Sequence, residues 1–555
     1  MYTVLRQFTK YPNKWKFLYD MRQFARVSPF KEDTLTGRFM LFLDNYRIPA
    51  NANHADLLSA VRRCPEDIKA FDAPQIVALL RALSDRELSS DKQELVELVD
   101  LECCDRVNQF SIEQTCDLLC AFTDVIGHRV VECRCFEPAL QSLLQQKSAL
   151  DHKQLVHLIF FVGLLKKCDH AQNIIRQCVK SLDKSGIESL TKEELCIICN
   201  ATFKTSTKIK HPALLAKVKE FIQDNLDLLK DPAVFVTLIK SIRHNRYQDE
   251  DILNTITCTM FFNKTLGHYS FGALCHILAL YADYLYYDEA LLDALVSRGV
   301  GLLKSCPFQS KRAHVADQPR EKDIKRFLWA LSNLNYRLSR EDIEEVVLPA
   351  IDVRRQAGGF GNPGDLVQIA LYLWMMHYQA RNLILTCVNE KSVQAIRGPK
   401  LPSQDSLNLL LTCIYYENPE LFKELNICLE KPQPYNFSFQ LNKRPALRQI
   451  VDSLKRAPLR NNIDRYETAC QVPFINIIGV VGLQKRLYKT VNVEVLDGFT
   501  CLKNTNNSPT GFMQLKLRLL EKRDEGLIVM EQNEVAECAA SELEHILRDE
   551  IALVC

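Results

Sequence analysis

The chain has 555 residues, too many for one hydrophobic core, so two to four domains or one repeat array are expected. Apolar residues make up 47% of it, and the longest strongly apolar stretch, 155–165, is far shorter than the ~20 residues that a membrane span requires. With 18 glycines and few alternating runs before position 470, the sequence predicts a mostly α-helical protein, and its net charge of +2 indicates no partner by itself.

The N-terminal residues are basic and amphipathic. Up to Ser28 they contain six Lys or Arg and one acid, Asp20, interleaved with large apolar side chains such as Trp15 and Phe17. This composition is typical of a mitochondrial presequence. Residues 1–30 are therefore interpreted as a targeting segment, with an ordinary basic helix as the alternative.

A short pattern recurs between residues 55 and 420: large apolar residues, then a small residue, then another apolar residue. The small positions are Ala82, Ala121, Gly163, Ala201, Ser241, Ala279 and Ala330, with looser matches at Tyr372 and Thr412. Their spacings are 38 to 42 residues except for one of 51, where the polar stretch 305–321 predicts an inserted loop. Helix pairs of this period stack into an α-solenoid, and the small residue would let neighbouring helices approach closely.

Capping residues agree with this period. Five side chains that cap free amides lie in or just before the first turn of a predicted helix: Ser111, Thr191, Asp231, Ser270 and Ser406. The local signals and the repeat therefore predict the same helices.

Two motifs suggest sites but lack their remaining parts. Cys196 and Cys199 have half of a zinc spacing with no second pair or nearby His, and the 21 cysteines lie largely in apolar runs, which favours free thiols in a reducing compartment and no metal site. The segment 359–364 matches GxGxxG, but the residues before it are predicted to be helical and the chain has no HRD or DFG sequence. We interpret it as a loop between repeats, without nucleotide or kinase chemistry.

The repeat period fades after residue 420. Residues 421–482 are interpreted as a connecting region with a Pro-rich linker, a basic segment at 445–466 predicted as one helix or two, and an apolar stretch at 472–483 predicted as a strand pair or strand entry. These predictions place the end of the solenoid near residue 420.

A small α/β domain is predicted for residues 483–555. Val491, Val493 and Val495 alternate with other residues, as in a strand with one buried face. Asp497-Gly498 ends this run, and apolar residues return at helical spacing from Gly511. The sequence thus predicts a strand, a polar loop and a helix.

Charge is distributed unevenly around this domain. Residues 441–490 carry ten Lys or Arg and three acids, a local balance of +7, whereas residues 491–555 carry six bases and twelve acids, a balance of −6. A basic segment before the α/β domain is compatible with a polyanionic partner, and solvated helix faces are the alternative.

The C-terminal segments resemble a known family. The run with Asp497-Gly498-Phe499, Asn504-Thr505, Gly511 and the helix 515–521 resembles the RAP domain of organellar RNA-binding proteins. The preceding segments 425–430, 434–435 and 447–454 are similar to the FAST-kinase-domain family, which places helical repeats before FAST subdomains and a RAP domain. This resemblance implies a protein of the mitochondrial matrix that binds RNA and affects the processing, stability or translation of mitochondrial transcripts.

The resemblance also raises the possibility of nuclease chemistry, because RAP domains are similar to the restriction-endonuclease-like fold. Such an active site needs two acids and a lysine around a divalent metal such as Mg²⁺. Asp497, Glu494 and Lys516 are the candidates, but Lys516 follows Gln514 instead of an acid and is predicted to be helical. The prediction is therefore a non-catalytic domain without a cofactor, with a metal-dependent RNA endonuclease as the alternative.

Binding of single-stranded RNA is the favoured interpretation. Cationic and polar side chains before and within the α/β domain could contact phosphates, and two aromatic residues could stack on bases. The candidates are Lys485, Arg486, Tyr488, Phe499, Lys503, Asn504, Lys516 and Arg518. A scaffold that binds ribosomal or RNA-processing proteins through the solenoid is the remaining alternative.

Overall fold

The structure, a computed structural model, describes residues 35–44, 65–84, 90–224, 230–262, 265–305, 319–397, 403–430, 438–456, 463, 465–484, 489–523 and 525–554. It separates into two compact units, Met1–Tyr247 and Gln248–Cys555. The targeting segment predicted for residues 1–30 lies outside the described residues, as does most of the loop predicted at 305–321.

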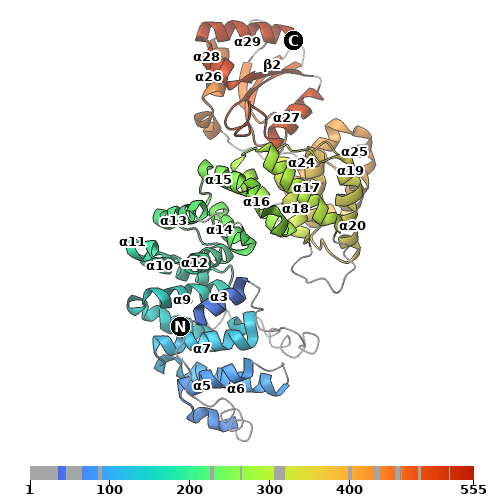
Figure 1. The fold of residues 1–555 in the computed structure, drawn as a ribbon. Helices are drawn as coiled ribbons and strands as arrows, with labels where there is room; N and C mark the ends of the chain where they lie inside the picture. The colour runs from blue at the N-terminus through green and yellow to red at the C-terminus, as the bar shows by residue number, and fades with distance from the viewer. Residues whose placement is uncertain are drawn as a thin grey trace. The chain divides into compact units, whose positions relative to one another are not determined.

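Unit 1 is built from helices throughout its described part (Figure 1). We call the helix that carries the repeated small residue the first helix of its repeat. The first helices are α5 (Ala73–Ser84), α7 (Ile112–Ile126), α9 (His152–Leu164), α12 (Lys192–Thr205) and α14 (Pro232–Asn245). Other helices of the unit include α3 (Leu35–Asp44), α6 (Ser90–Arg106), α8 (Phe136–Gln145), α10 (Asp169–Ser181), α11 (Lys184–Glu188) and α13 (Pro212–Asp224). Because the first helices pack in the order α5, α7, α9, α12 and α14, they form a helical-repeat array.

The repeated small residue lies where two first helices meet. A Cβ added to Gly163 of α9 would lie 2.9 Å from the Cβ of Ala201 on α12. Ala121, Ala201 and Ser241 are also buried, at 0%, 2% and 1% exposure. The close approach that the sequence predicts is confirmed where Gly163 meets Ala201, and the other small residues are buried as such packing requires.

Four of the five predicted capping residues are confirmed. Ser111 and Thr191 form capping boxes at the starts of α7 and α12, and Asp231 and Ser270 accept hydrogen bonds from backbone amides of the first turns of α14 and of α16 (Phe271–Tyr284). These bonds satisfy amides that have no partner within the helix, so each of these repeats begins at a defined residue. The fifth, Ser406, is the fourth residue of α24 (Ser403–Glu417) and does not precede that helix.

Unit 2 continues the helical pattern and adds the C-terminal domain. Its first helices are α16 (Phe271–Tyr284), α18 (Glu321–Asn333), α21 (Pro363–Met375) and α24 (Ser403–Glu417), which also pack in sequence order. The other helices of this part are α15 (Glu250–Phe262), α17 (Glu289–Ser305), α19 (Arg340–Asp342), the π-helical turn η9 (Ile343–Val347), α20 (Leu348–Gln356), α22 (Arg381–Cys387), α23 (Glu390–Ile396) and α25 (Pro419–Leu425). Residues 359–362 lie between helices α20 and α21, as predicted for a loop between repeats, whereas Pro363 and Gly364 form the start of α21.

The C-terminal part contains a four-stranded sheet in the order β1-β2-β3-β4. The strands are β1 (Arg465–Ala469), β2 (Gly479–Gln484), β3 (Lys489–Leu496) and β4 (Gly526–Glu531). The first three strands are antiparallel, and β4 pairs parallel with β3 after a crossover through α27 (Gly511–Glu521). The sheet therefore includes strands on the N-terminal side of residue 483, where the sequence predicted the α/β domain to begin.

The basic segment 445–466 contains one helix and the start of a strand. Helix α26 (Pro445–Arg456) packs against α29 (Ala540–Val554) and α28 (Gln532–Glu537). Together they cover the sheet face that carries Val491, Val493 and Val495, which belong to one buried hydrophobic cluster. Tyr466, predicted to be at the end of a helix, lies instead in β1 at the edge of the sheet.

The fold class predicted from the sequence, mostly α with a small C-terminal α/β part, agrees with this architecture. Within the described residues, no helix is both long and apolar enough to cross a membrane. The cysteines that the structure describes are free thiols, and Cys196 and Cys199 are fully buried. Burial raises the pKa of the Cys199 thiol to about 12, so this thiol packs as a small apolar group.

Candidate functional site

The second face of strand β3 is buried too, and it carries charged groups. Glu494 has 0% exposure and forms an ion pair with Lys516 of α27, which is also completely buried. The Lys516 Nζ also donates a hydrogen bond of 2.9 Å to the carbonyl oxygen of Ile477. Burial raises the pKa of Glu494 and lowers that of Lys516, and the attraction between the two groups opposes both shifts.

A second buried ion pair lies at the end of β3. Arg444 donates from Nε to Asp497 Oδ2 over 2.7 Å, and its other nitrogens donate to the carbonyl oxygens of Ile478 and Val495 over 2.5 and 2.9 Å. The other oxygen of Asp497 accepts from the backbone amides of Phe499 and Thr500, over 3.0 and 3.2 Å. The Thr500 hydroxyl also lies 3.1 Å from this oxygen, so one cation, two amides and one hydroxyl surround the Asp497 carboxylate.

These contacts bear on whether the three candidate nuclease residues are free to bind a metal ion. The structure brings Asp497, Glu494 and Lys516 into one region, and the charge of Arg444 acts on both members of the Glu494–Lys516 pair. Each carboxylate is paired with a buried protein cation, and neither of the two is exposed to solvent. Removal of one partner would leave an unpaired buried charge. Among the described residues, no group of three or more His, Cys, Asp or Glu is placed to hold a metal ion.

The loop between β3 and α27 contacts the helical repeats of the same unit. The backbone of Lys503 donates to the Leu285 carbonyl over 2.7 Å and accepts from the Tyr287 amide over 3.1 Å. Its side chain forms a 2.8 Å ion pair with Glu250 of α15. The Asn504 side-chain amide donates to the Tyr287 carbonyl over 3.0 Å. Both candidate RNA contacts thus bind other parts of the protein.

Helix α27 makes the second half of this internal interface. Arg518 pairs with Glu417 of α24 at 2.5 Å and donates to the carbonyl oxygen of Trp374 at the end of α21 over 3.0 Å. The Trp374 indole Nε1 donates to the same Glu417 carboxylate. A Cβ on Gly511 would overlap the carbonyl oxygen of Ser332 in α18, so only glycine allows this helix start to approach α18 so closely.

We call these contacts of the segment 499–518 with α15, the carboxyl end of α16, α18, α21 and α24 the docking interface. It places α27 between the sheet and the carboxyl ends of α18, α21 and α24 (Figure 1). Phe499 is half-buried, with the Arg444 guanidinium 5.8 Å from its ring centre. Lys485, Arg486 and Tyr488 lie outside the described residues.

The predicted RNA contact of Lys516 does not fit its position, because a side chain with 0% exposure cannot reach a phosphate. Arg518 is only 12% exposed and already paired, so the same reasoning applies to it. The sequence analysis did not identify Arg444 and Glu417, the distant residues that pair with Asp497 and Arg518. Arg444 stands in the +7 segment, so part of that positive charge is internal.

Comparison with known proteins gives one consistent match. No family model matches the chain. It is 24% identical over 280 residues to the human FAST kinase domain-containing protein 5, mitochondrial, and 22% identical to the mouse protein of that name. The orangutan (Pongo abelii) protein is 23% identical over 279 residues, and each alignment covers 49% of this chain.

Half of the chain is thus similar to FAST kinase domain-containing proteins. The match spans about a third of the length of these relatives, 32% in each case. The similarity therefore relates half of this chain to part of longer proteins.

Proposed function

We propose that this protein binds single-stranded RNA in the mitochondrial matrix and acts, without catalysis, on the processing, stability or translation of mitochondrial transcripts. The similarity to proteins named mitochondrial FAST kinase domain-containing protein 5 supports the family and the compartment. The RAP-like order of segments at the C-terminus supports RNA as the ligand. The proposed layout is a targeting segment at 1–30, a solenoid at 55–420, a FAST-like region at 421–482 and a RAP-like domain at 483–555.

The two buried ion pairs of the α/β domain carry the non-catalytic part of the proposal. A metal-dependent nuclease needs acids that are free to bind a cation, whereas Glu494 and Asp497 are paired with Lys516 and Arg444. The pairs connect β3 with α27 and with Arg444 at the start of α26, so we assign the four side chains to the interior of the domain and not to a metal site.

The docking interface supports the helical repeats as the main RNA surface. Lys503, Asn504 and Arg518 are used for contacts within unit 2. The α/β domain then fixes the end of the solenoid, and an extended strand of RNA binds along exposed cations of the repeats. A solenoid offers an extended surface of this kind because its repeats stack with similar geometry one after another.

The test of RNA binding combines cells and purified protein. Crosslinking in cells should recover mitochondrial transcripts, and the purified full chain should bind unstructured RNA with an affinity that falls with salt, by a log–log slope of about −0.7 per phosphate contact. A flat salt response together with no RNA recovered by crosslinking would overturn the proposal. Binding partners that persist after RNase treatment, without any RNA, would instead favour the scaffold alternative.

The non-catalytic part has its own test. Purified protein is incubated with mitochondrial transcripts and Mg²⁺, with EDTA and the Asp497→Asn variant as controls. We expect intact RNA in all three reactions. Cleavage by the wild type that disappears both with EDTA and in a folded Asp497→Asn variant would establish the nuclease alternative.

A further inference from the structure

In unit 1, the carboxyl ends of three successive first helices carry cations. Lys166 follows α9, Lys204 lies in the last turn of α12, Lys208 lies three residues beyond that helix, and Arg246 directly follows α14. Helices α9, α12 and α14 pack side by side in this order. We call these four residues, with Phe203, Lys240 and His244 beside them, the helix-end patch.

Four cations of the helix-end patch carry positive charge without a paired acid among the described residues. These four are Lys166, Lys204, Lys208 and Arg246, of which Lys204 is half-buried and the other three are exposed. Burial and then the charge of Lys166 lower the pKa of Lys204, and burial and then Arg246 lower the pKa of Lys208. Like charges therefore lie close enough to destabilise one another.

The effect extends to the neighbouring histidines. Burial and then Lys208 lower the pKa of His244, and burial followed by Lys204 and Lys166 lowers the pKa of His128. The carboxyl end of a helix attracts cations, which explains one basic residue at each end. It does not explain several cations in mutual repulsion, so an anion brought to this surface would be stabilised.

An aromatic ring lies within the same group. Phe203, on α12, is 37% exposed although it is a large apolar side chain. The Lys240 Nζ lies 5.8 Å from the centre of the ring, and the His244 ring lies edge-on at 6.1 Å. Cations that follow a backbone, together with an exposed ring for a base, are the combination with which proteins bind single-stranded nucleic acid.

Unit 2 uses its helix ends differently. There the carboxyl ends of α16, α18 and α21 contact the α/β domain through Lys503, Gly511 and Arg518, and both cations are paired with acids. In unit 1 the cations at the corresponding helix ends, Lys166, Lys204, Lys208 and Arg246, form no such ion pair with any acid that the structure describes. The charge and the exposed ring of the helix-end patch fit a polyanion with flat bases better than a protein segment.

We propose that the helix-end patch is a binding site for single-stranded RNA, in which Lys166, Lys204, Lys208 and Arg246 contact successive phosphates and Phe203 stacks on a base. This proposal rests on the RNA binding proposed above and assigns it a surface. It goes beyond the α/β domain, where the sequence placed all candidate contacts.

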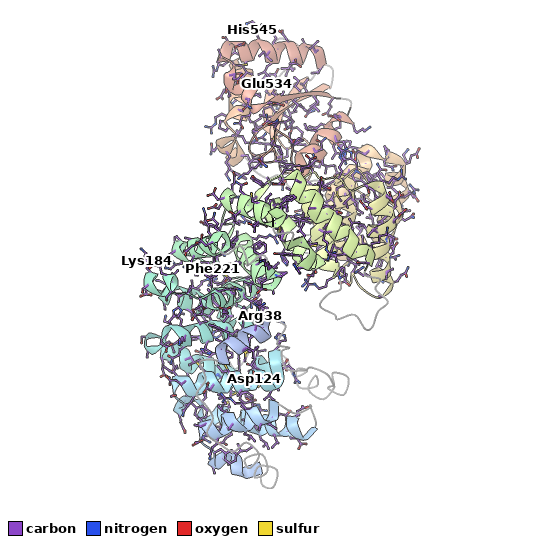
Figure 2. The ribbon with its side chains drawn as sticks, in the orientation of Figure 1. Arg38, Asp124, Lys184, Phe221, Glu534 and His545 are labelled. Atoms are coloured by element: carbon purple, nitrogen blue, oxygen red, sulfur yellow. The ribbon has the colours of Figure 1, made fainter. Side chains whose placement is uncertain are left out.

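The charge component is tested with two matched triple variants of the full chain. One is Lys204→Gln, Lys208→Gln, Arg246→Gln, and the control is Arg176→Gln, Lys180→Gln, Lys184→Gln, which removes the same charge from exposed residues of α10 and α11. Lys180 lies at the far end of α10 from Lys166, and Lys184 projects from the edge of unit 1 (Figure 2). Binding of oligouridylate RNA is measured from about 50 to 300 mM KCl, because the dependence of affinity on salt over such a range reports the number of phosphate contacts.

We expect the patch variant to bind more weakly and to lose up to about 2 units of log–log salt slope, about 0.7 for each of three contacts. The control should keep the slope and the affinity of the wild type. Equal behaviour of the two triple variants would overturn the helix-end patch while RNA binding by the chain stands. If the wild type binds no RNA at all, the proposed function fails together with this site.

The stacking component is tested at Phe203. Phe203→Leu keeps an apolar side chain of similar size, so the fold is retained, but the flat ring is lost. We expect affinity to fall about 5- to 150-fold with an unchanged salt slope, as for the loss of one stacked base. Phe203→Tyr should restore binding, because it restores the ring. Wild-type affinity in Phe203→Leu would overturn the assignment of the ring.

Discussion

The Glu494–Lys516 pair shows how the surroundings of a charged residue determine its role. Strand β3 holds Glu494 on the sheet, α27 holds Lys516 above it, and both side chains have 0% exposure. Transfer of each charge out of water is costly, and the attraction between them offsets much of that cost. Either side chain alone would therefore be a buried charge without a partner.

This pairing predicts an asymmetric double-mutant cycle. Lys516→Met should destabilise the α/β domain by about 3–5 kcal/mol because Glu494 is left unpaired, whereas Glu494→Leu with Lys516→Met should change its stability far less. The stability of the single and of the double variant is measured by urea unfolding, and hydrogen exchange of β3 reports on the α/β domain separately. Similar losses in the single and double variants would mean that the pair itself contributes the stability.

His377 provides a prediction about pH. Burial, then the charges of Arg518 and Arg337, lower its pKa from 6.5 to about 4. The unfolded chain therefore binds this proton first as the pH falls, so the free energy of unfolding should decrease from pH 6.5 towards pH 4. Above pH 6.5 His377 is neutral in both the folded and the unfolded chain, so this residue no longer lowers the free energy of unfolding.

The variant His377→Asn removes this contribution and tolerates the positive φ of 66° at this position. Urea midpoints at pH 7 and pH 5 should differ less for this variant than for the wild type. His545→Asn, at an exposed histidine of α29 (Figure 2), is the control and should keep the wild-type difference. An unchanged pH dependence in His377→Asn would contradict the assignment.

At the scale of elements, the packing of first helices depends on the size of one residue. Gly163 of α9 faces Ala201 of α12, whereas Gly301 of α17 has no atom within 4 Å of an added Cβ. Both glycines are helical, so alanine reduces the entropy of the unfolded chain at both sites. Only at Gly163 must the neighbouring helix move.

Opposite signs are therefore expected for the two alanine variants. Gly163→Ala should destabilise unit 1 by about 1–3 kcal/mol through overpacking. Gly301→Ala should stabilise its helix by about 0.5–1 kcal/mol. Thermal unfolding of the full chain compares each variant with the wild type, and stabilisation by Gly163→Ala would show that α9 and α12 have room to separate.

Elements were easier to predict than contacts. The repeat period, the caps at Ser111 and Thr191, strand β3 and helix α27 follow from local patterns and agree with the structure. Strand β1 was missed because RYETA is short, and its exposed edge position gives no clear alternation. Local patterns carry no information about pairs such as Arg518–Glu417, which lie 101 residues apart.

At the scale of the whole molecule, two residues predicted to contact RNA, Lys503 and Arg518, instead join the α/β domain to the helical repeats of unit 2. The Arg518–Glu417 pair is largely buried, with side-chain exposures of 12% and 8%, and it is connected to Trp374. The Lys503–Glu250 pair is exposed to 39% and 53% and is screened by water. The two cations should therefore contribute unequally to docking.

Replacing each of these two cations by methionine compares their contributions directly. Arg518→Met should weaken docking by about 3–5 kcal/mol because it leaves the Glu417 carboxylate buried without a cation, whereas Lys503→Met should cost about 0–1 kcal/mol. Hydrogen exchange by mass spectrometry on the full chain should show faster exchange in α27 and at the end of α21 for Arg518→Met alone. The fold of the sheet should persist, because the cluster around Val491 and Val493 does not include Arg518. Equal exchange in the two variants would mean that the backbone contacts of the 499–510 loop, and not the Arg518 pair, hold the α/β domain against the repeats.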